Sequence, residues 1–200
     1  MEIARWATDA AIPAAPVLPA AQVELRARIG WPCHLIRAMT IGWVGWTLLA
    51  FVWRWSDRAT LLGNAGHYLN ADLSGTTQAE YVWAAIVSVG NWMPLAAAGY
   101  CMWRLCGTYL DGRIFTVDAA VWMRRLGIAG LVTQLYAIVG RRIIWWILTS
   151  HGNVPLGTRL YTEVINPVDL STILFFLFVI AIAHIFKTAA EIADDNARIV

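Results

Sequence analysis

Four long apolar stretches dominate this sequence and constrain what it can fold into. Of the 200 residues, 59% are hydrophobic and only 14% are charged, and the mean hydropathy is +0.57. A soluble domain carries about a quarter charged residues, whereas a membrane helix needs about 20 mostly apolar residues in succession. We therefore expect an all-α integral membrane protein, a four-helix bundle whose spans and tails use up the chain.

The four spans are expected at about 37–55, 82–106, 125–149 and 168–187, within a membrane domain that covers residues 31–200. In the first span, Gly42 and Gly45 leave a small face on which a neighbouring helix should approach closely. In the second, Pro94 should kink the helix because it removes a backbone hydrogen bond. The small residues 96–99 that follow it form another expected packing surface.

Residues 1–30 differ in composition from the rest of the chain. They are rich in alanine and proline, so we expect an extended or flexible tail and no cleaved signal peptide. A short interfacial helix is expected over Gln22–Ile29, ended by Pro32. The later polar segment Ser56–Glu80 contains several glycines and is expected to be a loop, with only weak signs of a short helix.

The basic residues are distributed unevenly across the expected membrane. Ten fall on one side: Arg5, Arg26, Arg28, Arg37, Arg104, Arg113, Arg124, Arg125, Lys187 and Arg198. Three fall on the other: Arg54, Arg58 and Arg159. Short basic segments stay in the cytoplasm, so we expect both termini to be cytoplasmic. Tryptophans, which prefer the headgroup level, fall at both expected interfaces: Trp53, Trp55, Trp83, Trp145 and Trp146 on one side, and Trp31, Trp103 and Trp122 on the other.

The connector between the second and third spans mixes charged and large apolar side chains. Gly112 breaks the chain there, and Thr116 is expected to cap a helix that begins at Val117. Because the spans alternate, the connector, the amino-terminal tail and the helix after Lys187 should form one cytoplasmic surface. The residues expected to dock a partner on it are Arg113, Phe115, Trp122, Arg124 and Arg125. In the alternative, Phe115 and Trp122 anchor the connector in the headgroup layer.

Two arginines, Arg141 and Arg142, lie inside the third span, about eight residues or ~12 Å from its outer end. A charge at that depth is costly unless it is paired or extends to the interface. We expect at least one of them to pair with an acid near the outer face, for which Asp169, Glu80 and Glu163 are available. A binding site for an anion or a headgroup is the alternative.

Signatures of catalysis or of a cofactor are missing from the sequence. His34 and His184 fall near the cytoplasmic ends of the first and fourth spans, where a bis-histidine haem is conceivable, but interfacial histidines are usually amphipathic side chains. Cys101 and Cys106, five residues apart, do not share a helix face, so no thiol pair is expected. With no metal-ligand spacing, phosphate loop or Ser/His/Asp grouping, we expect a non-enzymatic protein without a cofactor. The net charge of +2 is too small to indicate nucleic-acid binding.

Two stretches resemble a known family. Leu110–Gly127, LDGRIFTVDAAVWMRRLG, is similar to the G-x-x-F-T…L-R-x-x-G connector of the bacterial membrane proteins catalogued as domain of unknown function 2975. Ile185–Val200, IFKTAAEIADDNARIV, resembles the exit of that family's fourth span, with matches at Lys187, Glu191, Asn196 and Val200. Asp195 stands where a Glu is expected and Ala189 where a Gly is common.

This resemblance covers the layout of about residues 31–200, and it implies a multi-pass protein of the bacterial cytoplasmic (inner) membrane. Members are often encoded beside small helix-turn-helix regulators, which implies a sensory or sequestering role. We therefore expect a regulatory or sensory protein, surrounded by the lipid bilayer, that docks another membrane protein or a cytosolic protein at its cytoplasmic face. The alternative is an accessory subunit held in a larger membrane complex by lateral helix contacts. The sequence carries no signal for an oligomeric state.

Overall fold

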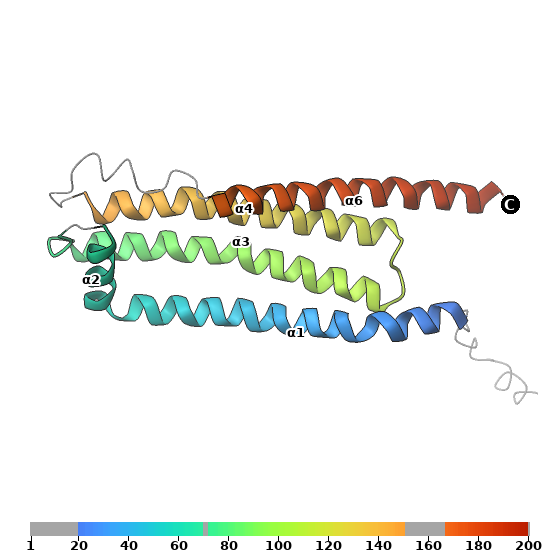
Figure 1. The fold of residues 1–200 in the computed structure, drawn as a ribbon, viewed down its shortest axis with the longest axis horizontal. Coiled ribbons are helices and arrows are strands. Elements are labelled where there is room, and N and C mark those ends of the chain that lie inside the picture. Colours follow the sequence, from blue (N-terminus) through green and yellow to red (C-terminus); the bar gives the residue numbers. More distant parts are fainter. Residues whose placement is uncertain (1–19, 70–71, 151–166, 200) are drawn as a thin grey trace, which may run out of the picture.

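The computed structural model describes residues 20–69, 72–150 and 167–199, which form five helices (Figure 1). Four are long: α1 (Ala20–Ser56), α3 (Gln78–Leu110), α4 (Val117–Leu148) and α6 (Pro167–Ile199); α2 (Arg58–Leu69) is short. Each long helix contains a segment apolar and long enough to cross a membrane: Gly30–Ser56, Gln78–Leu110, Val117–Leu148 and Pro167–Ala193. The prediction of an α-helical chain with four spans is confirmed over these residues.

The long helices lie side by side in chain order (Figure 1). Extensive packing joins α1 to α3, α3 to α4, and α4 to α6. The helices therefore form an open row with α1 and α6 on its two flanks, and not the closed bundle that was expected. This arrangement is physically reasonable in lipid, because closing the row would exchange lipid contacts for equally apolar helix contacts.

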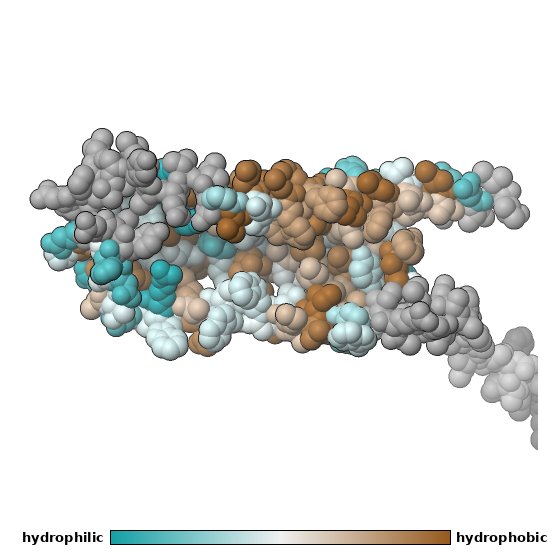
Figure 2. Space-filling view, in the orientation of Figure 1, coloured by the Kyte–Doolittle hydropathy of each residue, from teal (hydrophilic) through white to brown (hydrophobic). Residues whose placement is uncertain are grey.

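The two ends of this row differ in what they carry. The α3–α4 connector, the beginning of α1 and the end of α6 lie at one end, which we name the connector end (Figure 1). The helix α2 lies at the opposite end, named the α2 end. Figure 2 shows hydrophilic side chains gathered at the α2 end and strongly apolar ones along α6. The surface of α1 is paler because glycine and tryptophan rank near the middle of the hydropathy scale.

Helix α1 is continuous at Pro32, where the sequence suggested a break. It runs without interruption from Ala20 through Pro32 to Ser56, so the separate interfacial helix that Pro32 was expected to terminate is wrong. A proline inside a helix removes one hydrogen bond, and neighbouring groups can compensate in a membrane protein. Helix α3 likewise continues through Pro94. The expected tail over residues 1–19 lies outside the described residues.

The segment between α1 and α3 contains α2, the short helix that the sequence signalled only weakly. Asp57 precedes it and accepts hydrogen bonds from the Thr60 backbone N–H at 3.1 Å and the Thr60 hydroxyl at 2.6 Å. The Thr60 hydroxyl and then its N–H hold the pKa of the Asp57 carboxyl below its ordinary value, because both stabilise the ionised form. This capping pattern explains why the helix begins at this point.

Two long helices begin at threonine N-caps. The Thr116 hydroxyl accepts a hydrogen bond from the backbone N–H of Ala119 at 3.3 Å, which confirms the cap expected for α4. At the start of α3, Thr77 and Glu80 form a reciprocal capping box. Glu80 also accepts a hydrogen bond from the Ser150 hydroxyl, which connects the start of α3 to the end of α4.

Glycines permit close approach where α4 meets α6. A Cβ atom on Gly127 would lie 2.6 Å from Ile180 Cγ1, and one on Gly130 would lie 2.1 Å from the Phe176 ring. By contrast, Gly42 and Gly45 of α1 have nothing within 4 Å of such an atom, so their expected role in close packing is wrong. Whether a small residue forms a contact depends on the rotation of its helix, which residue spacing alone does not specify.

The long helices exceed the thickness of a bilayer. Helix α3 has 33 residues and α4 has 32, so each is about 50 Å long at ~1.5 Å per residue. The hydrocarbon layer is about 30 Å thick, which leaves about 10 Å, or roughly seven residues, beyond it at each end of a centred helix. Polar side chains about seven residues from a helix end therefore lie near the headgroups.

Candidate functional site: the connector end

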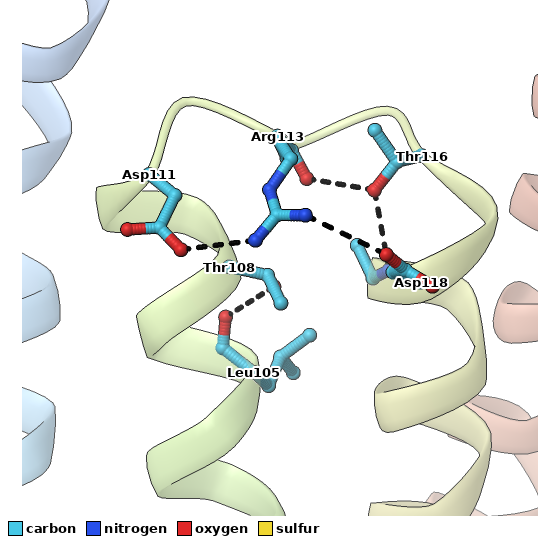
Figure 3. Close-up of polar contacts among 7 residues, drawn as sticks. Leu105, Thr108, Asp111, Arg113, Thr116 and Asp118 are labelled. Carbon is cyan, nitrogen blue, oxygen red and sulfur yellow. Dashed lines mark hydrogen bonds and ion pairs between the residues drawn. The ribbon is translucent and has the colours of Figure 1, made fainter.

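The connector between α3 and α4 is a compact turn held by Arg113 (Figure 3). The Arg113 guanidinium lies 3.1 Å from the carboxylate of Asp111 and 3.7 Å from that of Asp118, so it joins the end of α3 to the start of α4. The Thr116 hydroxyl donates a hydrogen bond to the Arg113 carbonyl at 3.0 Å. Gly112 has a φ of 77°, a left-handed conformation that favours glycine.

Phe115 projects from this turn. Its side chain is 76% exposed, and its ring meets the ring of Phe186 on α6 edge to face, with centroids 6.2 Å apart. One residue further along α6, Lys187 pairs with Glu191 at 3.4 Å. Figure 1 shows α1 and α6 extending past the connector on either side of it. An exposed aromatic ring therefore lies on an ordered turn between two projecting helices.

Trp122 has a different environment from Phe115, although both were expected to dock a partner. The Trp122 ring is half-buried and meets Tyr100 of α3 edge to face at 5.9 Å. The guanidinium carbons of Arg104 and Arg125 lie 5.1 Å and 4.7 Å from its ring centroid. The expected docking residues thus separate into the connector turn and a second cluster about a turn and a half of helix further into the row. Arg124 is exposed beside that second cluster.

An ion pair connects α4 to α6 towards the α2 end. The Arg141 guanidinium pairs with the Asp169 carboxylate, one of the acids expected as a partner, and Asp169 also accepts a hydrogen bond from Gln134 Nε2 at 2.6 Å. The Asp169 side chain is 9% exposed, whereas the Arg141 side chain is 47% exposed. Because Arg141 lies about seven residues from the end of α4, it is near the hydrocarbon boundary rather than deep in the membrane. Arg142 is half-buried, and no described residue pairs with it.

The two histidines considered as haem ligands are not brought together. His34 is exposed on α1 and His184 is exposed on α6, and these helices lie on opposite flanks of the row. Among the described residues, no group of three or more His, Cys, Asp or Glu side chains is arranged to hold a metal ion.

Sequence reasoning missed a contact between α1 and α3 at the connector end. Cys33 of α1 and Cys106 of α3 lie close to each other, and each cysteine is only 3% exposed. One turn further along α1, the Arg37 guanidinium lies over the Trp103 ring at 4.1 Å and its Nε donates to the Trp103 carbonyl at 3.3 Å. The sequence analysis compared only Cys101 with Cys106, which both lie on α3. The neighbour of Cys106 is Cys33, which lies on α1.

These features define a multi-pass membrane protein with four spans and an ordered, polar connector. The chain matches, over residues 19–200, the model of the family described as "Protein of unknown function (DUF2975)". It therefore belongs to that family, as its two motifs indicated. No curated protein and no solved structure matches it.

Proposed function

We propose that this protein is a non-enzymatic regulatory or sensory protein of the bacterial inner membrane, which docks a protein partner at its connector end. The observation that supports the proposal best is the 76% exposure of Phe115 on an ion-paired turn. Binding hot spots are commonly aromatic anchors surrounded by polar groups. A rigid turn also presents such an anchor with little loss of conformational entropy on binding.

The charges around Phe115 favour a protein over a nucleic acid. Arg113 is already neutralised by Asp111 and Asp118, and Lys187 by Glu191. The turn therefore lacks the excess of unpaired cations that phosphate backbones require. Mixed charge around one large apolar side chain is typical of a protein interface.

A cytoplasmic connector end is part of this proposal, and it rests on the ten-to-three bias of basic residues. Single cysteines introduced at Ser74 and Asp111, in a chain whose native cysteines are replaced by serine, provide the test. An impermeant thiol reagent added outside the cell should label the probe at Ser74 and leave the probe at Asp111 unlabelled. Labelling of the Asp111 probe from outside would contradict a cytoplasmic connector end.

The docking proposal is tested by Phe115→Ala with Phe178→Ala as the matched control. Phe178 has a comparable exposure of 61% but lies near the middle of α6, where lipid is expected to surround it. Proteins cross-linked to the tagged wild-type chain in cells are identified and compared at equal membrane abundance. We expect Phe115→Ala to lose a specific partner that Phe178→Ala retains. If Phe115→Ala retains every partner, Phe115 is a headgroup anchor.

One observation favours the second candidate, an accessory subunit held by lateral contacts. Trp43 and Trp46 lie near the middle of the α1 span and are 60% and 61% exposed. No described residue accepts a hydrogen bond from either indole, whereas the Trp92 indole donates to the Val44 carbonyl at 3.2 Å. An unsatisfied N–H group in the hydrocarbon layer is costly. Hydrogen-bond acceptors on a helix of a neighbouring protein would satisfy the N–H groups of both indoles.

Replacing Trp43 and Trp46 together by phenylalanine tests this candidate, because phenylalanine keeps an aromatic ring and removes the N–H donor. Trp53→Phe, near the end of α1, is the control. The candidate predicts that only the double variant dissociates from a larger complex on native gels in mild detergent. A complex of unchanged size would exclude this contact.

A further inference from the structure

We propose that Arg104, Trp122 and Arg125 form a binding site for a phosphate group, supplied by the headgroup of an anionic phospholipid. The three residues come from two neighbouring helices, α3 and α4, at the connector end. This site is separate from the connector turn proposed to dock a protein, and neither proposal depends on the other.

The geometry concentrates two cations on one ring. The guanidinium carbons of Arg104 and Arg125 lie 5.1 Å and 4.7 Å from the centroid of Trp122. Tyr100 meets the same indole edge to face at 5.9 Å and supports it from α3. Two like charges therefore lie within about 5 Å of the same indole, and an anion that contacts both guanidiniums would relieve their repulsion.

Both guanidiniums keep their hydrogen-bonding capacity. In the described part of the chain, neither Arg104 nor Arg125 forms an ion pair or a hydrogen bond, and both are exposed. A guanidinium has five N–H donors in a planar fork that matches two phosphate oxygens. By contrast, Arg113 is held by two acids, and Arg37 donates to the Trp103 carbonyl. These two arginines are therefore less available to an anion than Arg104 and Arg125.

The depth of the cluster indicates a lipid as the source of the phosphate. Arg104 lies six residues before the end of α3 and Arg125 eight residues after the start of α4, which places them about 9 and 12 Å from the helix ends. Each helix extends about 10 Å beyond the hydrocarbon layer, so both guanidiniums lie at the headgroup level. Basic pockets between membrane helices are known to bind anionic headgroups, and indoles favour the same level.

The test measures lipid binding to the full-length protein in a neutral detergent. Phosphatidylglycerol, phosphatidylcholine and inorganic phosphate are titrated separately, and the midpoint of thermal unfolding is followed. We expect a saturable increase of the midpoint with phosphatidylglycerol alone. For the double variant R104Q/R125Q, the apparent Kd for phosphatidylglycerol should rise about tenfold or more, since two charge-assisted hydrogen-bonding groups are lost. Arg124→Gln, which removes a neighbouring exposed cation outside the cluster, is the matched control and should change the Kd less than about twofold.

Several outcomes overturn the proposal. Unchanged affinity in the double variant excludes the site, and an equal loss in Arg124→Gln reduces the effect to nonspecific attraction by positive charge. An equal response to inorganic phosphate excludes the lipid as the source. If the double variant does not fold, Arg125→Lys keeps the charge and removes the fork. Native mass spectrometry should then find fewer bound phosphatidylglycerol molecules than on the wild type, and an equal number refutes the proposal.

Discussion

Gly127 is the position where one added methyl group tests the packing of α4 on α6 most directly. A Cβ atom there would lie 2.6 Å from Ile180 Cγ1 and 3.3 Å from two backbone atoms of α6, the Phe176 carbonyl oxygen and the Ile180 nitrogen. The Ile180 side chain can change its rotamer, but the backbone atoms move only if the whole helix moves. Gly130 is a weaker test, because its close neighbours all belong to the Phe176 ring.

The expected size of the effect follows from two opposing terms. Alanine is favoured over glycine in a helix interior by about 1 kcal/mol, whereas overpacking a tight contact costs about 1–3 kcal/mol. Gly127→Ala should therefore be destabilising by up to about 2 kcal/mol. At Gly45 an added Cβ meets nothing within 4 Å, so Gly45→Ala should be neutral or stabilising by up to about 1 kcal/mol. Comparing the two variants cancels the propensity term and isolates the overpacking.

Reversible unfolding in mixed micelles of mild and denaturing detergent provides the free energy of unfolding for both variants. We expect Gly45→Ala to be at least as stable as the wild type, and Gly127→Ala to be less stable than Gly45→Ala by about 1–3 kcal/mol. If the two variants have the same stability, then α4 and α6 do not approach each other closely at Gly127. The open row would then need a different arrangement of its last helix.

Three further predictions use other contacts. In a double-mutant cycle, Arg141→Leu and Asp169→Asn should show a coupling of about 0.5–1.5 kcal/mol, reduced because the arginine is half exposed, and additive losses would contradict the ion pair. Mild oxidation should cross-link Cys33 to Cys106 in a chain whose third cysteine is serine; peptide mapping that finds both thiols reduced would contradict their contact. The pKa of Asp57 is lowered from 3.8, so its cap is fully formed above pH 3.8 and is lost as the pH falls through the folded-state value. Hydrogen exchange in α2, corrected for intrinsic rates, should therefore accelerate only in acid, and Asp57→Asn should remove this dependence.

Features that depend on local sequence were predictable. The four spans follow from hydropathy alone, because each stretch must be apolar along its length to cross the hydrocarbon. The Thr116 cap follows from residue chemistry at one helix start. The pairing of Arg141 with Asp169 was also accessible, since the cost of an isolated membrane charge restricts it to the few acids at a similar depth.

Features that depend on the rotation of one helix against another were not predictable. Gly45 and Gly127 are both small residues in apolar helices, yet only Gly127 contacts a neighbour within 4 Å. The contact of Cys33 with Cys106 joins α1 to α3, and nothing in the sequence spacing relates the two. The different environments of Phe115 and Trp122 also depend on how the helices are rotated. The two residues are seven positions apart, yet Phe115 contacts Phe186 of α6 and Trp122 contacts Tyr100 of α3.

The arginines near the two membrane boundaries of α3 and α4 differ in their partners. Towards the α2 end, Arg141 is neutralised within the protein by Asp169. At the connector end, Arg104 and Arg125 share Trp122, and no described carboxylate neutralises them. An anion that neutralises these two arginines would therefore come from outside the described residues. Phe115 lies about 10 Å further from the hydrocarbon than this cluster, so a lipid headgroup and a docked protein would occupy successive layers. The two ligands would not compete for the same surface, and a partner on the connector would cover the bound headgroup.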